Sequence, residues 1–387
     1  MHVAEAERDS RLMAVAGLFL KLGAISFGGP AAHIALMEQE VVRKRAWLDR
    51  EHFLDLLAAT NLVPGPNATE MAIHIGYVYA GWPGLIVGGV AFIVPAFLIS
   101  LALSWVYGRF GALPEGQALF YGINPVVMAI ILVATYRLGR TALRDRVSVV
   151  LSLLALGAAL LGVDEVLILI GAGFVGILVN TAPDWLKQGT SAVWALPLMS
   201  RLGTVAPRTT GFDDRLLALG LFFLKVGSVL FGSGMVLFAF IQQDVVARYG
   251  WLSQQQLIDA IAVGQMTPGP VLSSATFIGY LVSGWPGAVV ATAGVFAPSF
   301  VIVSLVGPLI PRMRKSPTAQ AFLKGVNAAV VALILSVSLS LFRSAITDGW
   351  TVLIMAIGLL ALLRYRVDTF WLVLFGAGAG LAHGLLT

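Results

Sequence analysis

The chain has no cysteine and few charged residues. Of its 387 residues, 12% are Asp, Glu, Lys or Arg and 58% are hydrophobic, whereas soluble domains average roughly 25% and 45–50%. The lack of cysteine excludes a disulfide framework and thiolate metal sites. The sequence also has no nucleotide-binding loop, no metal-ligand cluster and no nucleophile–base–acid set. We therefore expect no enzyme activity, no metal and no cofactor.

The sequence contains several long apolar runs. They cover 84–106, 116–136, 147–162, 166–182, 287–306, 325–342 and 350–363, and they approach or reach the roughly 20 residues that span a bilayer. This pattern predicts an all-α, polytopic membrane protein. The charged N-terminus shows no cleavage pattern, so we expect no signal peptide. The net charge of +5 comes from loops between the runs and does not indicate a nucleic-acid partner.

One pattern occurs twice, 204 residues apart. The segment 19–29 returns as 223–233, and Pro-Gly-Pro at 64–66 returns as 268–270. After a slip of one residue, Gly-Trp-Pro-Gly at 81–84 returns as 284–287. We predict a first transmembrane repeat at 12–182, a cytoplasmic linker at 183–215 and a second repeat at 216–387. Two-fold repeats are common in transporters, where the substrate site lies between the halves.

The positive charges predict the orientation of these repeats. Most of the 25 Lys and Arg residues fall on one side if 38–52, 137–146, 183–215, 307–324 and the turn at 364–366 are cytoplasmic. By the positive-inside rule this is the orientation in the cytoplasmic membrane, and it places both termini outside. Equivalent loops carry opposite charge bias, since 38–52 is basic whereas 242–256 holds only Arg248. The repeats are therefore expected to cross the membrane in opposite directions.

Gly and Pro interrupt the apolar pattern at matching places in each half. The first interruption is at 27–30 and 231–234, and the second is at 64–67 and 268–271. Consecutive Gly and Pro break the helix ladder, and broken backbone within a membrane must be buried in protein or line a wet cavity. The second pair lies in hairpins, 53–80 and 257–283. Whether these hairpins are re-entrant or span fully stays open at this point.

A helix that restarts after a break offers free amides and the positive end of its dipole to an anion. Side chains beside the breaks can cap these helices or donate to a ligand. At Gly28-Gly29, close helix packing is an equal alternative to ligand binding, and the Asn124/Asn327 pair can equally bind substrate or join helices. The predicted substrate-binding residues at the breaks are Phe27, Gly28, Gly29, Pro64, Gly65, Pro66, Asn67, Thr69, Phe231, Gly232, Pro268, Gly269, Pro270, Ser273 and Ser274, together with Asn124 and Asn327.

Two lysines lie deep in the first apolar helix of each half. Lys21 and Lys225 each follow an arginine by ten residues, which is about 15 Å along a helix and near the centre of a hydrocarbon core of roughly 30 Å. An unpaired lysine at that depth costs at least about 2.5–3.5 kcal/mol. We interpret both lysines as counter-charges for an anionic substrate. The alternative is a structural ion pair.

Glu70 and His74 share one helix face in the first hairpin. Ser274 takes the place of Glu70 in the second half, so the repeat itself does not require an acid there. An acid inside a membrane domain is a candidate proton carrier. We therefore name Glu70 and His74 as proton-coupling candidates, with a packed polar residue as the alternative for His74.

The motif strings resemble those of the chromate ion transporter (CHR) family in its long, two-repeat form. They are FGGP at 27–30, PGPNATEMAIHIGY at 64–77, TPGP at 267–270 and ATFIGY at 275–280. The resemblance implies export of chromate, a tetrahedral oxyanion close in shape to sulfate. We expect a secondary transporter in which one repeat rocks against the other, driven by the membrane potential, a proton gradient or both.

Other functions remain as alternatives: uptake or exchange of sulfate or another oxyanion, a passive anion channel and, less well supported, a structural scaffold. The expected partners are the oxyanion and membrane lipid. A homo-oligomer is left open.

Overall fold

The computed structural model describes residues 2–111, 113–186, 212–306, 316–365 and 367–386, and these are helical with short connections. Most of the predicted linker 183–215 falls outside the described residues. The first half contains α1 (His2–Ile25), α2 (Gly29–Glu38), η1 (Gln39–Lys44), α3 (Arg50–Thr60), α4 (Asn67–Phe110), α5 (Pro114–Ala142), α6 (Arg146–Leu160) and α7 (Glu165–Leu186). The second contains α8 (Phe212–Val229), η4 (Gly234–Val236), α9 (Leu237–Phe240), η5 (Ile241–Arg248), α10 (Gln254–Met266), η6 (Val271–Ser273), α11 (Ser274–Val306), α13 (Pro317–Ala345), α14 (Gly349–Leu360), η8 (Ala361–Tyr365) and α15 (Thr369–Leu386).

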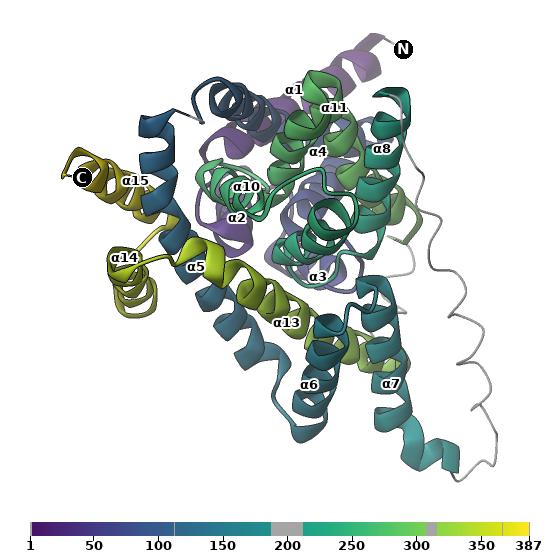
Figure 1. The fold of residues 1–387 in the computed structure, drawn as a ribbon. Helices are drawn as coiled ribbons and strands as arrows, with labels where there is room; N and C mark the ends of the chain where they lie inside the picture. Colours follow the sequence, from purple (N-terminus) through teal and green to yellow (C-terminus); the bar gives the residue numbers. More distant parts are fainter. Residues whose placement is uncertain (1, 112, 187–211, 307–315, 366, 387) are drawn as a thin grey trace.

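The helices form two bundles, and each bundle contains elements of both halves (Figure 1). In the first, α1 packs on α4, α8 packs on α11, and α4 and α11 pack on each other. We call this group, with α2, α3, α9 and α10, the break bundle, because it holds all four interruptions. In the second, α5 and α13 pack on each other and carry α6, α7, α14 and α15. We call this group the crossed bundle.

Within the break bundle, α4 and α11 are each a tight hairpin of two limbs. The backbone leaves helical geometry at Ala80 and Gly81 in α4 and at Ser283 and Gly284 in α11, with φ of 66° and 65° at the two glycines. The limbs of α4 then meet backbone to backbone, since a Cβ on Gly76 would collide with the Gly84 carbonyl. Only glycine permits this approach. The Gly-Trp-Pro-Gly motif is thus the turn of a helical hairpin.

Within the crossed bundle, the equivalent helices α5 and α13 run in opposite directions. Lys324 near the start of α13 forms an ion pair of 2.8 Å with Asp145, just beyond the end of α5. Gln117 near the start of α5 and Thr347 beyond the end of α13 line one pocket at the other end. The Lys324 ammonium and the backbone amide of Ser148 hold the pKa of Asp145 below its usual range. The antiparallel course fits the predicted inverted repeats.

The last two helices of each half pack on the other half. α6 and α7 pack on α13, and α14 and α15 pack on α5. Small residues allow this contact, because a Cβ on Gly122 of α5 would collide with the backbone of α15 at Gly376 and Gly380. The same relation holds where Gly325 of α13 meets the backbone of α7 at Ala172. The two halves are therefore interlocked.

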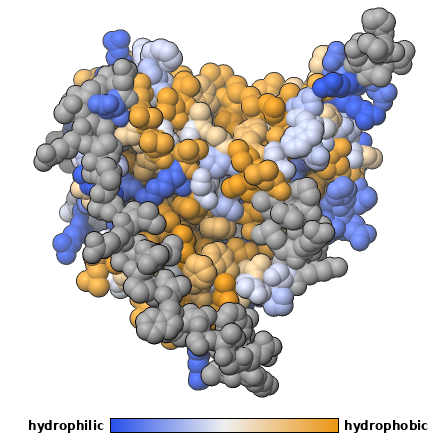
Figure 2. All heavy atoms as spheres, turned by 90° about the vertical axis from the view of Figure 1, so that its right-hand side faces the viewer, coloured by the Kyte–Doolittle hydropathy of each residue, from blue (hydrophilic) through white to orange (hydrophobic). Residues whose placement is uncertain are grey.

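Four helical stretches in the described residues are long and apolar enough to cross a membrane: Asn67–Phe110, Pro114–Ala142, Val271–Leu305 and Pro317–Ala345. Figure 2 shows apolar side chains gathered over the middle of one face, with hydrophilic side chains mostly along its margins. By contrast, α3 has 11 residues and is about 17 Å long, well short of a hydrocarbon core of roughly 30 Å. Its length favours the re-entrant form of the predicted hairpin 53–80.

The structure corrects one detail of the predicted topology. The predicted topology places the N-terminus, and with it Arg11, across the membrane from the cytoplasmic segment 38–52. In the structure, however, the Arg11 guanidinium lies 5.9 Å from the centre of the Tyr79 ring. The same ring stacks on Trp47 at 3.9 Å. The N-terminal part of α1 and segment 38–52 therefore lie at one end of the bundle. The expectation for Arg11 is wrong because α1 stops at the first break and the chain turns back, so α1 is one arm of a hairpin.

Cysteine labelling tests both points in this cysteine-free chain. Single cysteines at Arg50 and Gln254, the equivalent first residues of α3 and α10, should react with an impermeant thiol reagent from opposite sides of the membrane. A cysteine at Arg8 should react from the same side as Arg50. Reaction of Arg50→Cys and Gln254→Cys from one side contradicts the inverted repeat. Reaction of Arg8→Cys from the side opposite to Arg50→Cys contradicts the α1 hairpin.

Candidate anion site at the paired helix breaks

All four predicted interruptions are breaks in the backbone. α1 ends at Ile25 and α8 ends at Val229, and left-handed glycines follow, with φ of 96° at Gly28 and 73° at Gly232. The two Pro-Gly-Pro segments separate α3 from α4 and α10 from η6. The Gly-Gly and Pro-Gly-Pro motifs therefore end helices rather than merely packing them.

Two equivalent hydrogen bonds join the breaks of opposite halves. The amide of Gly65 donates to the Leu230 carbonyl at 2.7 Å, and the amide of Gly269 donates to the Ser26 carbonyl at 2.8 Å. Each Pro-Gly-Pro segment thus closes on the free carbonyl end of the other half's first helix. Such carbonyls have no partner within their own helix. The two pairs of breaks also meet each other, because a Cβ on Gly234 would lie 2.8 Å from Leu272, next to the second Pro-Gly-Pro segment.

Glu70 lies at this junction without a partner. It is fully buried, and neither carboxylate oxygen has a hydrogen-bond partner among the described residues. A Cβ on Gly65 would collide with Glu70 Oε1 and lie 2.8 Å from Ser299 Oγ. Ser299 belongs to the other half, and its hydroxyl also has no partner in the described structure. Polar groups buried without partners are rare in native proteins, and the described structure has two such side chains at this junction.

The hydroxyl and amide residues beside the breaks do not cap the restarted helices. α4 begins after Pro66 and η6 after Pro270, and neither start has a side-chain cap. Asn67 instead donates to Asn61 at 2.7 Å, and Ser274 donates to the Val271 carbonyl at 3.0 Å. Thr69 and Ser273 are buried, and their hydroxyls have no partner in the described part of the chain. The first-turn amides of α4 thus receive no side-chain acceptor.

Lys21 pairs with a buried carboxylate. Its Nζ lies 3.1 Å from Glu40 Oε1, and Lys44 Nζ reaches the same oxygen at 3.0 Å. Arg45 approaches the second oxygen at 3.5 Å. Glu40 thus pairs with Lys21, Lys44 and Arg45, and we call these four residues the Lys21 cluster. Because three cations share one carboxylate, the cluster keeps an excess of positive charge.

Lys225 occupies the equivalent cluster in the second half. Its Nζ lies 3.1 Å from Asp244 and 3.4 Å from Asp164, and Arg248 reaches Asp244 at 3.5 Å. We call this the Lys225 cluster. Here two cations face two carboxylates, so these charges balance, and Glu165 is buried beside them. Ion pairing is therefore the observed state of both lysines, with a positive excess only in the Lys21 cluster.

The remaining predicted residues are divided between two places. A Cβ on Gly232 would lie 2.8 Å from Asn327 Oδ1, so Asn327 lies against the second-half break. Asn124 does not lie in the equivalent place; it lines a separate pocket beside Asp259. Phe27 packs against Phe370 with ring centres 4.9 Å apart. His74 is buried, and its Nε2 has no partner among the described residues.

Sequence reasoning missed Glu40, Asp244, Asp259 and Ser299. A signal for the first two was present, since Glu40 and Asp244 are separated by the same 204 residues as Lys21 and Lys225. Asp55 and Asp259 share that spacing. Ser299 gave no such signal, because its equivalent is Ala96.

The two lysine clusters predict different effects of the same substitution. Lys225→Met leaves two carboxylates with Arg248 alone, whereas Lys21→Met leaves Glu40 with Lys44 and Arg45. We expect Lys225→Met to lower the free energy of unfolding by about 1–3 kcal/mol more than Lys21→Met does. This difference is smaller than for a fully buried ion pair, because both lysines are part-exposed. Thermal unfolding of the purified protein in detergent measures this difference. Adding Asp244→Asn to Lys225→Met should recover part of the loss, and equal unfolding temperatures for the two lysine variants contradict the assignment.

Comparison with known proteins identifies the family. The family model described as "Chromate transporter" matches residues 13–177 and 217–381, one copy in each half. The chain is 36% identical over 363 residues to a protein named "Chromate transport protein" from Cupriavidus metallidurans, covering 93% of this chain and 90% of that relative. It is 36% identical to a "Probable chromate transport protein" from Synechococcus elongatus, covering 89% of this chain and 87% of the relative. It is 28% identical to an "Uncharacterized transporter" from Methanocaldococcus jannaschii, covering 92% and 90%. No solved structure matches the chain. With both halves matched, the chain belongs to the chromate transporter family in its two-domain form.

Proposed function

We propose that this protein exports chromate, as a tetrahedral dianion, across the cytoplasmic membrane by alternating access. The substrate class follows the names of the relatives, and the site is the junction of the four breaks. One observation carries the proposal: the reciprocal hydrogen bonds from Gly65 to Leu230 and from Gly269 to Ser26. They join broken backbone from both halves at one place, as expected for a substrate site in an inverted-repeat transporter.

The junction suits an anion through its backbone. The start of α4 has no side-chain cap, so the first-turn amides and the positive end of the helix dipole are available to a ligand. The hydroxyls of Thr69, Ser273 and Ser299 add donors that have no partner among the described residues. A tetrahedral oxyanion accepts hydrogen bonds in several directions at once, which matches donors arriving from two halves.

The Lys21 cluster supplies the long-range attraction. Its three cations share Glu40, and the excess positive charge favours the approach of a dianion. The charge-balanced Lys225 cluster offers no equivalent attraction. We therefore assign the counter-charge mainly to the first half. Lys225 has a structural role in this proposal.

The contacts of α3 and α10 support alternating access. α10 packs against α5, α13 and α15 of the crossed bundle, whereas α3 packs mainly on α4. Accordingly Leu54 of α3 is 49% exposed, and its equivalent Ile258 in α10 is fully buried. Glu51, His52 and Asp55 on α3 are exposed as well, which points to water rather than lipid on that side. Equivalent helices in unequal surroundings are expected when one side is open and the other closed.

The division of the fold also suggests which parts move. Each bundle contains elements of both repeats, so the moving units are the break bundle and the crossed bundle rather than repeat against repeat. In this scheme the break bundle carries the anion between an opening beside α3 and one beside α10. The membrane potential, negative inside, favours exit of a dianion by about 4.6 kcal/mol at 100 mV.

Transport in proteoliposomes tests the function. Labelled chromate and labelled sulfate are supplied separately, with the membrane potential and pH gradient set independently. We expect chromate counterflow, in which unlabelled chromate on the far side accelerates labelled influx. An anion channel shows no such acceleration, and preference for sulfate with no chromate counterflow identifies the sulfate alternative. Either result rejects the proposal.

Glu70 offers a more specific test. Its carboxylate is fully buried at the junction, where a negative charge and a bound dianion repel each other. A proton on Glu70 therefore favours the anion, and binding of one favours binding of the other. Glu70→Gln imitates the protonated form and cannot release a proton. We expect this variant to bind chromate, as measured by isothermal titration, and to transport it with little response to an imposed pH gradient. A wild-type response to the gradient removes Glu70 from proton coupling.

A further inference from the structure

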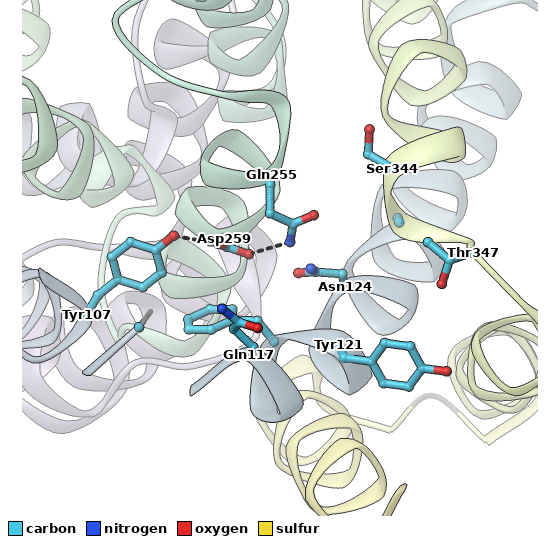
Figure 3. Close-up of a pocket in the computed structure, with 11 residues that line it drawn as sticks. Tyr107, Gln117, Tyr121, Asn124, Gln255, Asp259, Ser344 and Thr347 are labelled. Atoms are coloured by element: carbon cyan, nitrogen blue, oxygen red, sulfur yellow. Dashed lines mark hydrogen bonds between the residues drawn. The ribbon is translucent and has the colours of Figure 1, made fainter. Parts of the chain in front are cut away.

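A polar pocket lies between the two bundles, apart from the breaks. It has a volume of about 400 Å³ and is formed by the end of α4, the start of α5, the start of α10 and the end of α13 (Figure 3). Its lining residues are Tyr107, Gly111, Gln117, Phe120, Tyr121, Asn124, Gln255, Asp259, Ser344, Ala345 and Thr347. None of these described lining residues is Lys, Arg or His, so the pocket does not suit a dianion.

Asp259 is the acid of this pocket. It is 2% exposed and accepts hydrogen bonds from the Tyr107 hydroxyl at 2.7 Å and from Gln255 Nε2 at 3.1 Å. The amide of Asn124 interacts with the same carboxylate. All three partners are neutral. A buried carboxylate without a cation is costly, so this environment favours uptake of a positive charge.

Asn124 provides a hydrogen-bond acceptor for a proton on Asp259. It is 4% exposed, and its Oδ1 has no hydrogen-bond partner in the described structure. Figure 3 shows its amide directed toward Gln255 and Asp259. An ionised carboxylate needs donors, whereas a protonated one needs an acceptor for its hydrogen. An amide serves both states, because its Nδ2 donates to the first and its Oδ1 accepts from the second.

The equivalent acid in the first half shows what opening would do. Asp55 occupies the position of Asp259 on α3 and is exposed. In the opposite conformation, the α10 side would be open and the α3 side closed. Asp259 would then be exposed and Asp55 buried. The surroundings would differ, because Lys324 stands at the position equivalent to Tyr121, Glu51 at that of Gln255 and Ile310 at that of Tyr107. A buried Asp55 would therefore lie near a cation, whereas a buried Asp259 lies among neutral groups.

We propose that Asp259, with Asn124, is a proton site that couples a proton to closure of the α10 side. Asp259 takes up a proton when α10 packs against the crossed bundle and releases it when that side opens. The contact joins the halves, since Asp259 comes from the second and Tyr107 and Asn124 come from the first. Uptake of the proton therefore stabilises one arrangement of the bundles. The proposal rests on the transport function proposed above and adds the group that exchanges the proton.

Other titratable groups lie around the pocket. Tyr107 on α4 and Tyr121 on α5 line it. Behind Tyr121 are Asp348, which accepts its hydrogen bond, and His383 of α15, whose ring stacks on it at 4.9 Å. α11 and α13 contribute no titratable side chain to the described lining. Asp259 is the acid in the lining, and a His383→Gln variant controls for titration nearby.

The first experiment measures chromate transport by the full-length protein in proteoliposomes, with and without an imposed pH gradient. The ratio of the two rates should exceed one for the wild type and fall to about one for Asp259→Asn. Asp259→Glu should restore it. Two matched controls, Glu115→Gln on the exposed start of α5 and Asp55→Asn on α3, should keep the wild-type ratio. A wild-type ratio in Asp259→Asn overturns the proposal, as does a sodium gradient that replaces the proton gradient in the wild type.

A second measurement needs no anion and separates this inference from the transport function. Infrared difference spectra of the reconstituted protein, taken between acid and alkaline conditions, should contain a carboxylic acid carbonyl band that is absent in Asp259→Asn and present in Glu115→Gln. A spectrum unchanged by Asp259→Asn overturns the proposal even if that variant does not transport. If the wild type shows the band but no chromate counterflow, the transport function fails and the proton site stands.

Discussion

Broken backbone inside an apolar protein must find hydrogen-bond partners, and most of this fold follows from that requirement. Each break leaves amides and carbonyls that no neighbour in its own helix can satisfy. Leu230 and Ser26 supply carbonyls to the glycine amides of the opposite half. The end of the first helix of one half and the Pro-Gly-Pro segment of the other half must therefore lie side by side. The glycine contacts in α4 and α11, where the limbs meet without side chains between them, hold the hairpins that bring these ends together.

The junction and the lysine clusters differ in how completely their charges are satisfied. Glu40 and Asp244 are buried and surrounded by cations, so these clusters are stable without a ligand. Glu70 is fully buried and has no cation partner in the described structure. Two buried carboxylates thus have opposite electrostatic surroundings. Glu40 is held by ion pairs near the first break, whereas Glu70 has no such pair among the described residues.

Much of the arrangement could be predicted from the sequence, because Gly and Pro act locally. The positions of the breaks and the turns at Gly81 and Gly284 follow from the chemistry of those residues. The direction of α1 could not be predicted from charge alone. Arg11 looked like the far end of a spanning helix, and only the ring contacts with Tyr79 place it beside Trp47. The counting rule assumes full crossings, and α1 is one arm of a hairpin. Asp259 was missed because its partners Tyr107 and Asn124 are distant in sequence, so the polar pocket around it is visible only in the fold.

The packing of each half's last two helices on the other half has a consequence for a chain that contains one half alone. α6 and α7 pack on α13, and α14 and α15 pack on α5, so each half covers the other's long helix. A chain with one half alone would leave its long helix uncovered, and its Gly65 amide would lack an acceptor. Such a chain can complete the fold only by pairing with a second chain inserted upside down. Two half-length genes would then have to produce proteins of opposite membrane orientation, or one gene a protein that inserts both ways. Fusion into one chain removes that demand on insertion and frees the two halves to diverge, as Glu70 and Ser274 have done.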